Sequence, residues 1–314
     1  FFSYPCTSTF VKISISMNQR IILGIDPAFR TGCKLSVVNE QGTVLEKGVI
    51  YPHEKTMGGH ISDKQIQESQ RDLLLLIKKH KVELIAIGNG TASRETESFV
   101  ADLLKTTGLK AQYVIVNEAG ASVYSASDLA RKEFPELQVE ERSAVSIARR
   151  LQDPLSELVK IDPKSIGVGQ YQHDVAQKNL SDSLDFVVET AVNQVGVNVN
   201  TASVQLLQYV AGLNKTQASN IVKYRETKGA FKNREEIKNV PRLGDKAYEQ
   251  AAGFIRIKDG RNPLDNSSLH PESYSVVKKM AKELSVAVED LLGNSELLSK
   301  LAKNSFDQVD SYTF

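Results

Sequence analysis

Two short turns, about thirty residues apart, carry residue types suited to binding a phosphate. The first covers residues 210–215 (VAGLNK) and the second covers residues 240–246 (VPRLGDK). A segment with helical spacing of small and apolar residues follows the first turn, as Ala218 and Ile221 show. A turn that opens a helix leaves backbone N–H groups without partners, and the helix dipole adds positive charge there. The pattern predicts paired helix-hairpin-helix motifs that bind a nucleic-acid backbone.

Both turns depart from a simple Gly-x-Gly pattern. Asn214 stands at the second glycine position of the first turn, where we expect a left-handed backbone conformation, which Asn tolerates better than most residues. Arg242 stands at the first glycine position of the second turn, where it either adds a phosphate contact or weakens the backbone approach. Such contacts position a strand without reading its sequence. The residues expected to bind nucleic acid are Gly212, Leu213, Asn214, Lys215, Arg242, Gly244 and Lys246.

The charge distribution agrees with a nucleic-acid partner for this segment. Residues 196–260 hold eleven Lys or Arg and six Asp or Glu, which gives +5, whereas the whole chain is +1. The alternative is that the two helical hairpins only pack a core, with Gly212 and Gly244 as turn residues.

A second group of residues has the chemistry of a metal-dependent nuclease. Asp26 ends the first expected strand, Glu118 follows the fifth, and Glu140 and Glu141 open a later helix. Two-metal cleavage of nucleic acid needs several carboxylates around Mg²⁺ or Mn²⁺. The catalytic candidates are Asp26, Glu118, Glu140 and Glu141, the metal candidates are Asp26 and Glu118, and Glu95 and Glu97 are weaker candidates.

Other features of the sequence speak against a complete metal site. Asn89 follows the fourth strand in place of an acid, and no Asp opens the final helix of this region. The alternative is that Asp26 caps a turn before Pro27 and that the glutamates are solvated surface acids. No GxxxxGK[ST] phosphate loop is present, and no Asp-x-Gly loop follows a long strand, so nucleotide hydrolysis is disfavoured.

The elements that position these acids follow a recognisable order. Three strands predict an antiparallel meander, and a helix and a β-α-β unit closed by Gly108 come next. The expected strands are residues 20–25, 34–39, 43–50, 84–88 and 112–116, and the expected helices are 64–79, 93–106, 121–134 and 139–151. This is the order of the ribonuclease-H-like fold. The predicted fold class is α/β with a mixed five-stranded sheet, followed by an all-α part.

The rest of the chain reads as helical. Residues 153–177 look irregular, and helices are expected at 180–194, 272–284 and 287–303, with Asn200 or Thr201 capping a further helix. The expected division is a tail at 1–19, a sheet domain at 20–152, a joint at 153–179, tandem hairpins at 180–260 and a C-terminal helical module at 261–314.

Composition narrows the class of protein. A chain of 314 residues with 41% hydrophobic residues predicts two or three globular domains. Two cysteines with no metal-ligand spacing favour a reducing cytoplasm, and no apolar run is long enough to span a membrane.

Several segments resemble the Tex family of bacterial transcription accessory proteins and its YqgF-type domain. They are residues 24–34 (GIDPAFRTGCK), 88–97 (GNGTASRETE), 117–125 (NEAGASVYS), 164–174 (KSIGVGQYQHD) and 199–203 (VNTAS). The resemblance implies a cytoplasmic nucleic-acid-binding protein of transcription and RNA handling, with RNA polymerase or other transcription machinery as a partner. Full-length members add an N-terminal helical region and a C-terminal OB-type RNA-binding module, so the resemblance implies a central fragment. It also implies a partial helix-hairpin-helix-like module after Gly260.

This sequence differs from the family pattern at one place and from related resolvases at another. Ala28 stands where the family usually has Gly, and the last helix of the sheet domain begins Glu140-Glu141-Arg142-Ser143, without the Asp of related resolvases. Three hypotheses remain: a non-catalytic module that binds DNA or RNA backbone without sequence specificity, a Mg²⁺- or Mn²⁺-dependent nuclease or resolvase, and a protein scaffold for the transcription machinery.

Overall fold

The computed structural model describes residues 20–54, 61–258, 260–294 and 297. The chain divides into two compact units between Asp174 and Val175. None of the helices in the described ranges is long and apolar enough to cross a membrane.

The first unit is built on a mixed five-stranded sheet of order β3-β2-β1-β4-β5. The strands are β1 (Ile22–Asp26), β2 (Cys33–Val38), β3 (Val44–Ile50), β4 (Leu84–Gly88) and β5 (Gln112–Val116). Strands β1, β2 and β3 are antiparallel, whereas β4 and β5 run parallel to β1. This arrangement confirms the ribonuclease-H-like sheet that the sequence predicts.

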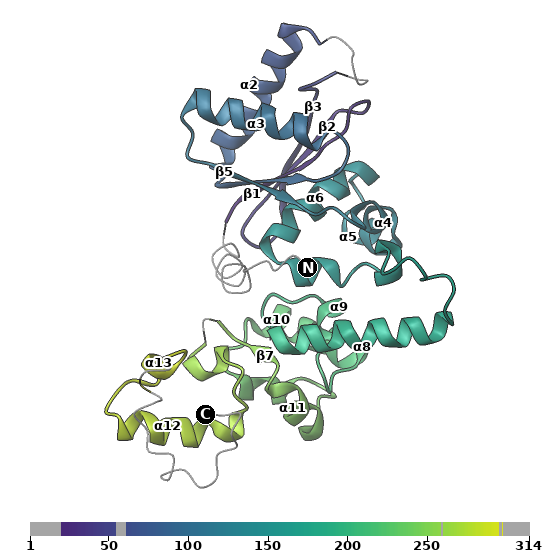
Figure 1. Ribbon diagram of the computed structural model, residues 1–314. Coiled ribbons are helices and arrows are strands. Elements are labelled where there is room, and N and C mark those ends of the chain that lie inside the picture. The colour runs from purple at the N-terminus through teal and green to yellow at the C-terminus, as the bar shows by residue number, and fades with distance from the viewer. Residues whose placement is uncertain (1–19, 55–60, 259, 295–296, 298–314) are drawn as a thin grey trace. The chain divides into compact units, whose positions relative to one another are not determined.

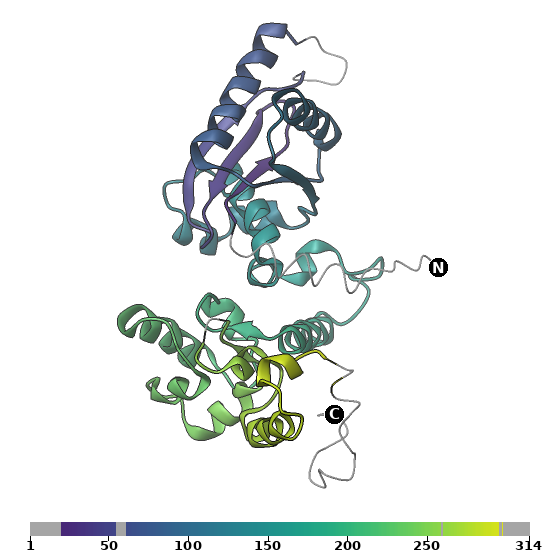
Figure 2. The same cartoon turned by 90° about the vertical axis from the view of Figure 1, so that its left-hand side faces the viewer.

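Helices cover both faces of this sheet (Figures 1 and 2). Helices α2 (Asp63–His80) and α3 (Ser93–Thr107) bury one face, and α6 (Val139–Gln152) buries the other. Alternate residues of β1 point to opposite faces, so Leu23 packs against α2 and α3 while Ile22 packs against α6. A Cβ on Gly24 would lie 2.2 Å from the Ala144 carbonyl oxygen. The missing side chain therefore lets α6 lie close to β1.

The remainder of the first unit differs from the sequence-based expectation in two places. The helix expected over 121–134 is two helices, α4 (Ala121–Ala126) and α5 (Asp128–Glu133). Ser127 separates them because its backbone is extended and its hydroxyl accepts the Ala130 N–H as a helix cap. The interval 153–177, expected to be irregular, contains helix α7 (Pro154–Leu158) and the 3-10 helix η1 (Pro163–Ile166).

The second unit starts with the long helix α8 (Gln177–Val195) and continues through short elements. These are β6 (Val197–Asn198), α9 (Val204–Leu207), α10 (Lys215–Lys228), η2 (Arg234–Asn239), α11 (Asp245–Ala252) and β7 (Ile255–Arg256). Strands β6 and β7 form a parallel pair that the sequence did not indicate. Ser203, and not Asn200 or Thr201, caps α9, because the Ser203 hydroxyl accepts the Leu206 N–H.

Short helices complete the second unit: η3 (Pro263–Asn266), η4 (Pro271–Ser273), α12 (Tyr274–Glu283) and α13 (Val288–Leu291). Most of the helix expected over 287–303 lies outside the described residues. The buried guanidinium of Arg234 ties η2 to this region by donating to the carbonyls of Ser267 and Leu269 and to the Tyr274 hydroxyl.

Candidate nucleic-acid interface

The first hairpin joins α9 to α10. Gly212 is left-handed with φ 81°, and the flanking Val210 and Leu213 side chains are buried. Asn214 is not left-handed as expected, because its φ is −108° and its side chain accepts the Gln217 N–H as the helix cap. The Gln217 side chain returns the contact by accepting the Asn214 N–H at 2.9 Å. The signal for this capping box is Asn followed three residues later by Gln.

The second hairpin joins η2 to α11 and repeats this geometry. Arg242 is left-handed with φ 63°, and Val240 and Leu243 are buried. Gly244 has an extended backbone and is the N-cap residue of α11. Because glycine has no side chain, no side chain of the cap residue stands between a ligand and the start of α11. A Cβ on Gly244 would contact nothing within 4 Å.

Both hairpins expose backbone N–H groups. Gly212, Lys215, Arg242, Gly244 and Lys246 are exposed. Within the described part of the chain, the N–H groups of these five residues donate no hydrogen bond to another residue. Unpaired N–H groups at the start of a helix are a favourable environment for an anion.

Each hairpin lies against the helix that follows the other. Asn220 and Gln217 of α10 donate side-chain hydrogen bonds to the carbonyls of Pro241 and Arg242, at 2.8 and 3.3 Å. In turn, a Cβ on Gly212 would lie 2.6 Å from the Cβ of Gln250 in α11. The two motifs therefore form one packed pair.

The surface charge near the hairpins is smaller than the sequence count indicates. Arg234 and Arg256 are buried, and burial together with the neighbouring Arg234 lowers the pKa of Arg256 to about 10. Arg225 donates to the Val199 carbonyl at 2.7 Å. These three arginines hold the domain together, and the exposed cations of the hairpins are Lys215, Arg242 and Lys246.

In the first unit, Asp26 lies at the end of β1 and faces two acids, Glu118 and Glu140, and one lysine, Lys34. Burial, followed by the nearby charges of Glu118 and Glu140, raises its pKa to about 6, against a hydrogen bond with Ser143 and the charge of Lys34. Lys34 is the cross-strand neighbour of Asp26, and its buried ammonium donates to the Thr31 and Gly32 carbonyls. The sequence did not identify Lys34 as a residue of this site, although the antiparallel register of β1 and β2 places it opposite Asp26.

Glu118 is held by the backbone between β4 and α3. A Cβ on Gly88 or Gly90 would collide with its carboxylate, and the Gly90 backbone forms a hydrogen bond with it. Burial raises the pKa of Glu118, while the charge of the buried Arg150 opposes that rise. The Asn89 side-chain oxygen accepts the Glu118 N–H at 3.0 Å. Asn89 therefore holds the loop that carries Glu118 and contributes no negative charge to the site.

The remaining candidate acids do not complete a metal site with Asp26. Glu141 belongs to the N-terminal capping box of α6 and forms an ion pair with Lys47 at 2.9 Å, while Glu140 and Glu95 are exposed. Among the residues that the structure describes, no three His, Cys, Asp or Glu side chains are grouped so that they could hold a metal ion. Asp26 and Glu118 are fewer carboxylates than two-metal cleavage with Mg²⁺ or Mn²⁺ needs, although the buried Oε2 of Glu118 has no hydrogen-bond partner among the described residues.

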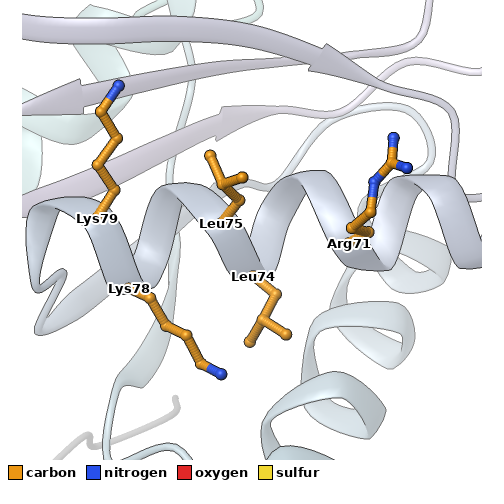
Figure 3. Close-up of a pocket in the computed structure, with 5 residues that line it drawn as sticks. All are labelled: Arg71, Leu74, Leu75, Lys78 and Lys79. Carbon is orange, nitrogen blue, oxygen red and sulfur yellow. The ribbon is translucent and has the colours of Figure 1, made fainter.

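Two further features do not form a reactive site. Cys33 is buried beside His53 and Thr96, and burial raises the pKa of the Cys33 thiol and lowers that of the His53 imidazole. Both groups are therefore held neutral. A hollow of about 490 Å³ on α2 is lined by five residues that point to two sides of the helix, so no polar groups converge there (Figure 3).

Comparison with known families assigns most of the chain. Residues 20–152 match the Tex protein YqgF-like domain, residues 192–256 match a helix-hairpin-helix motif, and residues 262–313 match a helix-hairpin-helix domain. The second match contains both hairpins described above.

Curated relatives are similar over almost the whole chain. The uncharacterized protein YdcI of Bacillus subtilis is 59% identical over 285 residues, which are 91% of this chain and 38% of that protein. The transcriptional accessory protein Tex of Neisseria gonorrhoeae is 52% identical over 285 residues, or 90% of this chain and 36% of that protein. The human S1 RNA-binding domain-containing protein 1 is 39% identical over an alignment of 338 positions, which covers 91% of this chain and 33% of that protein. The chain thus spans well under half the length of these relatives.

Proposed function

The chain belongs to the Tex family by its domains, and from this premise we propose that it binds nucleic-acid backbones through its two hairpins. The observation that supports this most is that the exposed residues Gly212, Lys215, Arg242, Gly244 and Lys246 have backbone N–H groups without a partner within the described residues. Phosphate oxygens are the acceptors that match such groups, and Lys215, Arg242 and Lys246 supply charge beside them.

This mode of binding has two consequences. Backbone N–H groups contact phosphates and not base edges, so we expect binding to tolerate any sequence and to accept DNA and RNA. Each phosphate contact releases counterions, so the affinity should fall steeply as salt rises.

The role of the first unit completes the proposal. The described residues hold no group of three acids that could bind a metal ion, and Glu141 is paired with Lys47. The charge of Lys34 also acts on Asp26, so we propose a ribonuclease-H-like domain that does not cleave nucleic acid. The names of two relatives refer to transcription and to RNA binding. We propose that this chain acts beside the transcription machinery in the cytoplasm, with RNA polymerase as a candidate partner.

A charge-reversal variant tests the interface. Lys215→Glu, Arg242→Glu and Lys246→Glu together should abolish the shift of a labelled DNA duplex and of a labelled RNA strand in a gel. The matched control is Lys78→Glu, Lys105→Glu and Lys110→Glu, which changes the net charge equally on exposed lysines of the first unit. Unchanged binding by the hairpin variant, or equal loss in the control, would remove the hairpins from the proposal.

A further inference from the structure

One amide side chain links the backbones of the two hairpins. The Gln217 Oε1 accepts the N–H of Asn214 in the first hairpin at 2.9 Å, and its Nε2 donates to the Arg242 carbonyl of the second hairpin at 3.3 Å. Asn220, one turn further along α10, donates to the Pro241 carbonyl at 2.8 Å. We propose that Gln217 and Asn220 are positioning residues that fix the two hairpins so that they hold one nucleic-acid backbone at two points together. This inference rests on the proposed function.

The Asn220 contact also sets the direction of a phosphate-binding group. In a trans peptide the carbonyl and the following N–H point in opposite directions. Because the Pro241 carbonyl points to Asn220 on α10, the Arg242 N–H of the same peptide points away from α10. Arg242 is exposed, and its N–H donates to no other described residue. Asn220 therefore orients a donor that it does not itself supply.

The reciprocal contact strengthens the link from the other side. Gly212 lies so close to α11 that a Cβ there would meet the Cβ of Gln250 at 2.6 Å and the Ala247 carbonyl oxygen at 3.2 Å. Neither hairpin can shift without disturbing the helix of the other. Two contacts held at a fixed separation make the second binding event intramolecular, and this raises the overall affinity beyond that of either contact alone.

The test separates positioning from charge. In the full chain, Asn220→Ala removes no charge, so we expect an affinity about tenfold weaker for a labelled DNA duplex with the slope of log affinity against log salt unchanged. Arg242→Gln should instead lower that slope by about one. Asn179→Ala, which removes the same amide from an exposed position on α8, should bind as the wild type does.

Thermal unfolding distinguishes a purely structural role. If Asn220→Ala lowers the melting temperature but binds normally while folded, Asn220 supports only the fold and the inference is overturned. The binding affinity and melting temperature of Gln217→Ala are interpreted by the same criteria, and this variant replaces Asn220→Ala if Asn220→Ala does not fold. A wild-type chain that binds neither DNA nor RNA would contradict the proposed function itself, which is a different result from normal binding by the variants.

Discussion

Gly212 and Arg242 adopt the same left-handed backbone conformation at equivalent places of the two hairpins, with φ of 81° and 63°. Each is followed by a buried leucine and then by an extended residue that opens a helix. Left-handed backbone costs a residue with a Cβ about 1–2 kcal/mol, a cost that glycine does not have. The second hairpin therefore keeps a cation at a position where glycine is more stable, which is a pattern found at functional sites.

This relationship predicts opposite effects of Arg242→Gly on stability and on binding. Glycine relieves the backbone strain of the folded chain, but it also adds conformational entropy to the unfolded chain, which opposes part of this gain. The net rise in the free energy of unfolding should be about 0.5–1 kcal/mol. Loss of the guanidinium should weaken nucleic-acid binding. Urea denaturation and fluorescence anisotropy measure the two effects. A variant that is both less stable and normal in binding would show that Arg242 serves the fold.

The reverse change in the first hairpin should be destabilising. Gly212→Ala places a Cβ at φ 81° and 2.6 Å from Gln250, so strain and overlap add. We expect a loss of about 2–3 kcal/mol in the free energy of unfolding. Gly244→Ala is the control, because Gly244 is extended and its Cβ would meet no atom within 4 Å. Similar losses in the two variants would contradict this account.

The local sequence predicted the hairpins because their signals are local. Turn residues, buried valines and helical spacing all lie within a few positions of one another, and strands β4 and β5 were predicted with their observed bounds. The prediction for Asn214 was wrong because it treated the residue as a substitute for glycine. The Asn-x-x-Gln pattern of a capping box was equally available in the sequence.

The contacts that organise the site were not predictable in the same way. The bridge from Gln217 to the Arg242 carbonyl depends on how two helices pack, and no pattern within either hairpin indicates it. Among the nuclease candidates, chain position alone placed Asp26 and Glu118 at the ends of strands and Glu140 and Glu141 at the start of a helix. Only the folded neighbours show that Glu141 is bound to Lys47.

Arg234 should be essential for the second unit. Its guanidinium is buried and donates to three backbone carbonyls and the Tyr274 hydroxyl. Arg234→Met removes the donor to the Ser267 and Leu269 carbonyls and to the Tyr274 hydroxyl, whereas the Ile255 carbonyl still accepts from Arg256. We therefore expect a loss of about 3–5 kcal/mol in the free energy of unfolding. Lys232→Met, at an exposed position nearby in the chain, is the matched control. Urea denaturation followed by circular dichroism measures both, and equal stability would contradict the assigned role.

The raised pKa of Asp26 predicts a pH-dependent stability of the first unit. The folded chain holds this proton more tightly than the unfolded chain, whose carboxyl has a pKa of 3.8 against about 6 when folded. The stabilising contribution is therefore complete below pH 3.8 and is lost as pH rises through 6. Asp26→Asn mimics the protonated group, so its stability relative to the wild type should grow over this range by up to about 3 kcal/mol.

Denaturant titrations of both proteins at several pH values test this prediction. The groups that face Asp26 are Ser143, Lys34, Glu118 and Glu140, so Glu140→Gln is a useful second variant. Removing that negative charge should move the pH-dependent step of the wild-type protein towards lower pH. A difference between wild type and Asp26→Asn that stays constant from acid to neutral pH would show that Asp26 titrates normally.

The last prediction concerns metal and cleavage. Lys34 is the cross-strand neighbour of Asp26 and donates to the Thr31 and Gly32 carbonyls. The Gly90 backbone binds Glu118, whose buried Oε2 has no hydrogen-bond partner among the described residues. A divalent ion at this place would meet the positive charge of Lys34, and the described residues offer it fewer grouped carboxylates than a two-metal site needs. We therefore expect Mn²⁺ and Mg²⁺ to leave the melting temperature of the wild type unchanged, and incubation with branched, duplex and single-stranded substrates to give no cleavage. Cleavage that appears with Mn²⁺ and disappears in Asp26→Asn would instead establish a nuclease, whatever the hairpins bind.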